Sequence, residues 1–167
     1  PEVVSSIISS YLAYGQTSSK ERAKQKLIEL SNSEKKEDRI IAAKIVNNWF
    51  DREVLMKLLK DPSNEVRRIA CDSCNQVDKE IITCIVDNLM IPHLKSSCLA
   101  VILRYPNIAF EEIASRFLSE TSRVQKTLIS VLGLLKTEKS FEFLQSLLLI
   151  INREHFKDVL IALKLNN

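Results

Sequence analysis

One apolar pattern returns about every 28 residues along this chain, and it constrains the fold more than any other feature. Around Arg67 and Ala70, apolar side chains follow spacings of three, four and seven residues, which place them on one helix face. A helix pair of this kind buries its apolar stripe only by stacking on neighbouring pairs. Pairs equivalent to Arg67 and Ala70 occur 28 residues earlier, 28 residues later and 30 residues beyond that, at Arg39 and Ala42, Lys95 and Cys98, and Gln125 and Leu128. A last, looser copy of the pattern puts Phe156 and Leu160 on the inward face.

Turn-forming residues are scarce, which favours helices with short connections over a sheet. The 167 residues include two glycines and four prolines, while 46% are hydrophobic and 27% are charged. We expect Pro92 in the first turn of a helix and capping side chains in Glu120-Thr121-Ser122. The apolar spacing predicts helices over residues 2–14, 19–31, 35–50, 52–60, 64–77, 79–90, 92–104, 107–119, 122–136, 138–149 and 152–165.

The stretch from Asp61 to Ala70, with Val66 and Arg67 at the start of a helix, resembles the turn and second helix of a HEAT-like, armadillo-type repeat. The resemblance covers residues 35–165. It implies an all-α fold, a right-handed α-solenoid of about five stacked helical hairpins. We expect one α-solenoid domain over residues 1–167, and we expect the chain to be a fragment of a longer protein. Proteins built from such repeats include scaffolds, transport receptors, subunits of phycobilin lyases and DNA glycosylases for alkylated bases.

In this architecture the second helix of each hairpin, the B helix, lines the concave face. Steps of 100° per residue put an apolar seam of Ala43, Cys71, Leu99 and Ile129 on that face. The seam suits a peptide or an amphipathic helix, and Leu99→Asp and Ile129→Asp would then abolish binding without unfolding. A tightly curved stack would instead hide these positions, which the rarity of exposed apolar patches favours. The predicted partner-binding positions are Lys44, Arg68, Cys71, Asp72, Asn75, Leu99, Leu103, Lys126 and Ile129.

Nucleic-acid binding is the alternative, through a relationship to the HEAT-like alkylbase glycosylases. Such an enzyme needs aromatic, acidic and basic side chains together, and Trp49-Phe50-Asp51-Arg52 offers them, but Trp49 falls on the inward stripe. A basic run, in which Lys24 is central, is more typical of a solvated helix face. The net charge is only +3. A concave face dominated by Lys44, Arg67, Arg68, Arg104 and Lys126 without neutralising acids would favour nucleic acid.

Four cysteines lie within expected helices without a disulfide-framework spacing, which favours a reducing, cytoplasmic setting. Cys71 and Cys74 form a C-x-x-C, but small buried thiols are the favoured interpretation, and we expect no metal and no cofactor. Neither a signal peptide nor a membrane-spanning apolar run is present in the sequence.

The motifs of the chain carry no catalytic signal: no Ser/His/Asp set and no phosphate-binding glycine loop is recognisable. We therefore expect a non-enzymatic scaffold that binds another protein or peptide, without membrane insertion.

Overall fold

The computed structural model describes residues 2–151 and 153–166, and over these residues it consists of helices without strands. The chain divides into two compact units. The first comprises Pro1–Val77 with Ile91–Cys98, and the second comprises Asp78–Met90 with Leu99–Asn167. A single domain over residues 1–167 stays a prediction. Among the described residues, no helix combines the length and apolarity needed to cross a bilayer.

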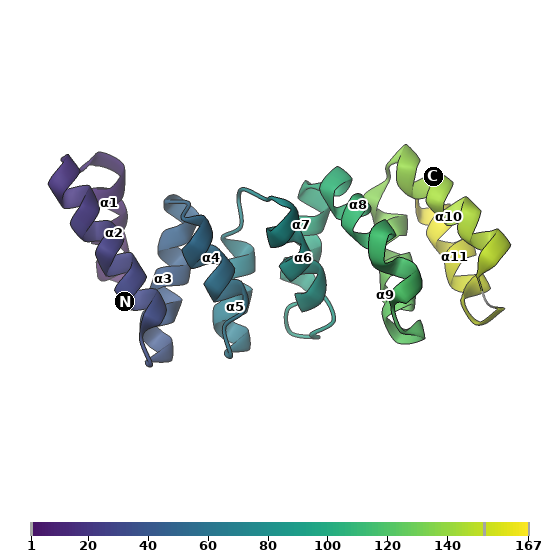
Figure 1. Ribbon diagram of the computed structural model, residues 1–167, viewed down its shortest axis with the longest axis horizontal. Coiled ribbons are helices and arrows are strands. Elements are labelled where there is room, and N and C mark those ends of the chain that lie inside the picture. The colour runs from purple at the N-terminus through teal and green to yellow at the C-terminus, as the bar shows by residue number, and fades with distance from the viewer. Residues whose placement is uncertain (1, 152, 167) are drawn as a thin grey trace. The chain divides into compact units, whose positions relative to one another are not determined.

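Each of the eleven expected helices has a counterpart in the described part of the chain (Figure 1). The first unit contains α1 (Glu2–Tyr14), α2 (Thr17–Asn32), α3 (Lys36–Asn48), α4 (Arg52–Leu59) and α5 (Asn64–Asp72). Helix α7 (Lys95–Arg104) begins in the first unit and continues in the second. The second unit also contains α6 (Lys79–Asn88), α8 (Pro106–Arg116), the short 3-10 helix η1 (Phe117–Ser119), α9 (Ser122–Leu135), α10 (Glu138–Ile150) and α11 (Arg153–Asn166).

Two expected helix boundaries are wrong. Helix α5 ends at Asp72 rather than at residue 77, because the backbone tightens there: Cys74 N donates to Cys71 O, three residues back, at 3.0 Å. The polar residues that follow compete with the helix for backbone hydrogen bonds. Helix α7 begins at Lys95, and Pro92 lies in the preceding turn rather than in the first helical turn.

Several helices begin with a side-chain cap. Asp51 accepts a hydrogen bond from Val54 N at 3.1 Å at the start of α4, and Asp78 caps α6 in the same way. Thr137 forms a capping box at the start of α10. Thr121 occupies the N-cap position of α9, but its side chain makes no capping hydrogen bond, so the expected side-chain cap is not formed there.

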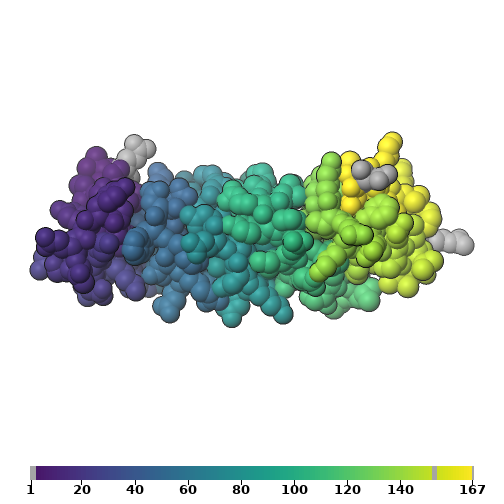
Figure 2. Space-filling view, turned by 90° about the horizontal axis from the view of Figure 1, so that it is seen from above, coloured from purple at the N-terminus to yellow at the C-terminus, as the bar shows by residue number. Residues whose placement is uncertain are grey.

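In the first unit, α3 contacts α1 and α5, α2 contacts α4, and α3 also contacts α2 and α4 (Figure 1). Figure 2 shows the atoms of residues 2–77, coloured purple to teal, as a continuous surface. Ala42, Ala70 and Cys98, which the sequence aligns as equivalent inward positions, are all fully buried. The side chain of Asn75 donates to the backbone oxygen of Asn47 at 3.0 Å. These two residues stand 28 apart, so the contact has the period of the apolar pattern.

A partly buried ion pair joins the first turn of α3 to the turn before α5. Arg39 Nε donates to Asp61 Oδ2 at 2.6 Å, and this hydrogen bond raises the pKa of Arg39. The other carboxylate oxygen accepts from Ser63 N at 2.8 Å. Asp61 therefore holds the turn before α5 and neutralises Arg39 of α3.

In the second unit, α8 contacts α6 and α10. Helices α9 and α11 contact each other, and each of them also contacts α10. Arg116 on α8 donates to Asp87 Oδ1 at 2.7 Å and to Glu120 Oε1 at 2.6 Å. The rings of Phe110 and Phe117 meet Phe143 of α10 edge to face. Charged and aromatic contacts thus fix α8 to its neighbours.

The expected register of the last copy is wrong by one residue. His155 and Val159 are buried, whereas Phe156 and Leu160 are 45% and 46% exposed. The shift follows from a close approach of α9 and α11: a Cβ atom built on Gly133 would lie 2.8 Å from the Cα of Ala162. Only small side chains fit at this crossing, so it fixes which face of α11 turns inward.

Candidate interaction surfaces

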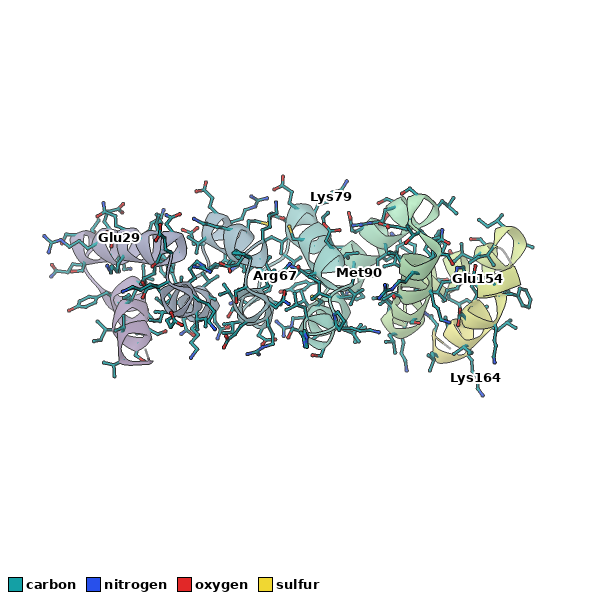
Figure 3. The ribbon with its side chains drawn as sticks, turned by 90° about the horizontal axis from the view of Figure 1, so that it is seen from below. Glu29, Arg67, Lys79, Met90, Glu154 and Lys164 are labelled. Carbon is teal, nitrogen blue, oxygen red and sulfur yellow. The ribbon has the colours of Figure 1, made fainter. Side chains whose placement is uncertain are left out.

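The predicted positions on α3, on α5 and in the segment just after α5 form a polar surface. Lys44, Arg68, Asp72 and Asn75 are exposed, and Asn47 lies beside Asn75. Arg68 Nη1 donates to Asp72 Oδ2 at 2.9 Å, one helical turn away on α5. Figure 3 shows side chains projecting from this part of the first unit, around the labelled Arg67. We call these five residues the α3/α5 polar surface.

The apolar seam expected on that face is not exposed. Ala43, Cys71 and Ile129 are fully buried, and Leu99 is half-buried. The reason is that helices here are covered on several sides: α3, for example, contacts α1, α2, α4 and α5. A broad arc of each helix is therefore core, and the positions expected to bind an apolar partner instead pack inside the units.

The other predicted positions lie in the second unit. Leu103 is 41% exposed, and Lys126 is exposed on α9. Lys126 Nζ lies 3.6 Å from Asp158 Oδ2 of α11, so an acidic group neutralises this lysine. Lys126 is therefore not one of a row of basic side chains that lack acidic neighbours.

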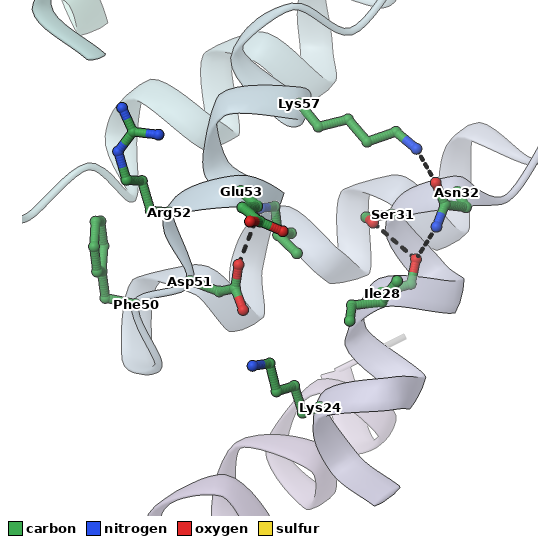
Figure 4. A pocket seen from close by; sticks show the side chains of 10 residues that line it. Lys24, Ile28, Ser31, Asn32, Phe50, Asp51, Arg52, Glu53 and Lys57 are labelled. Atoms are coloured by element: carbon green, nitrogen blue, oxygen red, sulfur yellow. Dashed lines mark hydrogen bonds between the residues drawn. The ribbon is translucent and has the colours of Figure 1, made fainter. Parts of the chain in front are cut away.

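A cleft of about 560 Å³ lies between α2 and α4 of the first unit (Figure 4). Lys24 and Asn32 of α2 line one wall, and Phe50, Asp51 and Lys57 belong to the other side. Lys57 donates a hydrogen bond to the Asn32 side-chain oxygen, which bridges the two helices. The cleft offers both polar and apolar side chains, which suits a ligand that has both polar and apolar parts.

Part of this cleft is a group of residues that the sequence singles out for another reason. Phe50, Asp51 and Arg52 belong to the group considered for a glycosylase, and the structure brings Lys24 of the basic run to them. Trp49 is not the expected inward anchor: it is the C-cap of α3, extended and half-buried. The contribution of α2 was missed, because a contact between separate helices leaves no mark in local spacing.

Ser122, His155 and Asp158 come together in the second unit, although no such set is recognisable in the sequence. Ser122 Oγ lies 2.8 Å from His155 Nε2, and His155 Nδ1 lies 3.6 Å from Asp158 Oδ2. The second distance exceeds a hydrogen bond, so the orienting bond of a catalytic triad is not made. His155 is buried between α9 and α11, where its bond to Ser122 joins the two helices.

The four cysteines are all buried and reduced. Cys71 and Cys98 are in contact, with 3.7 Å between their sulfur atoms, and the Cys74 thiol donates to Gln76 O at 3.6 Å. Among the described residues, no three His, Cys, Asp or Glu side chains are grouped as ligands of a metal ion would be. The Cys71–Cys98 contact joins residues of separate helices, and the C-x-x-C motif gives no sign of it.

No family model matches the sequence, and no curated protein or solved structure matches it either.

Proposed function

We propose that the chain is a non-enzymatic protein-interaction domain built from HEAT-like helical hairpins arranged as a right-handed α-solenoid. The observation that carries the proposal is the contact between alternate helices within each unit: α3 with α5, and α6 with α8. Stacked hairpins require such contacts, since each apolar stripe is buried by the equivalent helix of the next hairpin.

Polar contacts with the repeat spacing support the same arrangement. Lys36 pairs with Glu65 across 29 residues in the first unit, and Lys139 pairs with Glu111 across 28 residues in the second. These pairs are exposed and contribute little stability. Their value here lies in their register, which is that of the apolar pattern.

The partner binds at the α3/α5 polar surface. Lys44, Arg68 and Asp72 carry charge of both signs, and Asn47 and Asn75 carry amides that donate and accept hydrogen bonds. A polar, charged peptide segment or loop matches these groups. The amphipathic helix suited to an apolar seam does not, because the seam positions are buried.

Nucleic-acid binding remains the second candidate, and the α2/α4 cleft is the observation that favours it. Phe50, Asp51 and three basic residues, Lys24, Arg52 and Lys57, line the cleft. An aromatic ring and cations are the groups that hold an unstacked base and its phosphate. On the B helices, by contrast, acids neutralise Arg68 and Lys126, so protein binding is the favoured function.

Two charge reversals in the same unit separate the candidates. One variant combines Lys44→Glu with Arg68→Glu on the α3/α5 polar surface, and the other combines Lys24→Glu with Arg52→Glu in the cleft. Both change the net charge equally, and all four side chains are exposed. Peptides selected from a displayed random library on the wild-type protein serve as probes, and circular dichroism confirms the fold of each variant.

We expect the selected peptides to bind the first variant at least about tenfold more weakly, and the second as tightly as the wild type. Equal binding to all three proteins would contradict the proposed surface. Salt-dependent retention of duplex DNA that only the cleft variant loses would support the nucleic-acid function instead.

A further inference from the structure

Two thiols of the first unit stand in contact at helix ends. Cys71 is the penultimate residue of α5, and Cys98 lies in the first turn of α7. Their sulfur atoms are 3.7 Å apart, and both side chains are fully buried. The contact joins two parts of the unit that are 27 residues apart in sequence, with residues 78–90 of the second unit between them.

We propose that Cys71 and Cys98 form a reversible oxidation site, at which a peroxide converts the two thiols into a disulfide. A disulfide has a sulfur–sulfur distance of about 2.05 Å, so the sulfurs must approach by about 1.6 Å. Small rotations about the two Cα–Cβ bonds move sulfur atoms over this range. Cys74, three residues after Cys71, donates to Gln76 O at 3.6 Å, and the tests below distinguish it from Cys71.

The reaction balances with the peroxide as the sole oxidant. One thiolate attacks a peroxide oxygen, the O–O bond breaks, and a sulfenic acid and water form. The second thiolate attacks the sulfenic sulfur, the S–S bond forms, and the hydroxide leaves with a proton as water. Two thiols and one hydrogen peroxide thus yield one disulfide and two waters. An external dithiol reverses the product to two thiols.

Access to the pair is controlled by the helix ends. A hydrogen bond with Cys98 and burial raise the pKa of the Cys71 thiol, so little thiolate exists in the closed state. Terminal turns of helices open more readily than their centres. Oxidation therefore proceeds from a locally opened state, and it is slower than that of an exposed thiol.

Peptide mapping tests the site on the folded protein. The chain is treated with hydrogen peroxide, quenched with N-ethylmaleimide in denaturant and digested with trypsin without reduction. We expect a link between residues 69–79 and 96–104 that disappears after dithiothreitol. Because residues 69–79 also contain Cys74, the same mapping is done on Cys74→Ala, in which this link can arise only from Cys71.

Thiol counting gives a second measurement. The wild type, with four cysteines, should lose two thiols, whereas Cys98→Ala should keep all three of its thiols. Fragmentation of the wild-type peptides assigns the bond even where a variant does not fold. The proposal is wrong if the native protein yields no link, a bond between Cys71 and Cys74, or only over-oxidised cysteine.

Discussion

In the first unit, α3 and α5 follow the register that the apolar pattern predicts, whereas in the second unit α11 is rotated by one residue against α9. Ala42 and Ala70 are both buried, and Asn75 bonds to the residue 28 positions earlier. In the second unit, Gly133 and Ala162 bring the two backbones together, and His155 rather than Phe156 is buried. A helix crossing of small residues can therefore override the more hydrophobic face.

The largest expected effect tests the rotated register directly. Val159→Asp places a carboxylate in a fully buried position, and we expect a loss of more than about 4 kcal/mol in the free energy of unfolding. Leu160→Asp, at the neighbouring half-exposed position, should cost less than about 1 kcal/mol. Urea unfolding followed by circular dichroism measures both. A larger loss of stability for Leu160→Asp than for Val159→Asp would support the register that the sequence predicts.

Gly133→Ala tests the crossing itself. Alanine normally stabilises a helix relative to glycine by about 1 kcal/mol. Here the new methyl group would lie 2.8 Å from the Cα of Ala162, so we expect a loss of about 2 kcal/mol instead. Ser130→Ala, on the exposed side of the same helix, is the matched control and should change stability by less than about 0.5 kcal/mol. A stabilising Gly133→Ala would refute the close approach.

In the first unit, the ion pair between Arg39 and Asp61 connects α3 to the turn before α5. Asp61→Ala removes the acceptor of Arg39 and of Ser63 N, and we expect a loss of about 2 kcal/mol in thermal or urea unfolding. Asp72→Ala breaks a similar contact to Arg68, but that pair is about half exposed and should contribute less than about 0.5 kcal/mol. Equal losses of stability in Asp61→Ala and Asp72→Ala would show that burial does not determine how much an ion pair contributes here.

The smallest expected effect is a gain. Lys136, the C-cap of α9, has the left-handed conformation, with φ of 53°. This conformation is energetically unfavourable for any residue that has a Cβ atom. Lys136→Gly should raise the stability by about 0.5–1 kcal/mol, measured as an increased melting temperature. Thr137→Gly, at the next position, removes the capping box of α10 and should lower stability. A destabilising Lys136→Gly would mean that the lysine side chain contributes more than its backbone strain costs.

Burial of the expected apolar seam revises one substitution expected from the sequence. Ile129 is fully buried on α9, so Ile129→Asp is now expected to unfold the second unit rather than to abolish binding alone. Leu99 is half-buried and its substitution should cost less. The candidate surface that stays open to solvent is the polar one, of which the sequence identified Lys44, Arg68, Asp72 and Asn75.

The sequence by itself determined the helical class, the positions of the helices and the inward residues Ala42, Ala70 and Cys98, because apolar periodicity is local information carried by each helix. Only the tertiary structure decided the rotation of α11, the α2/α4 cleft and the contacts of His155 with Ser122 and of Cys71 with Cys98. These depend on which faces of separate helices meet. That choice is made by steric fit between neighbours, where a glycine opposite an alanine can outweigh a larger apolar side chain one position away.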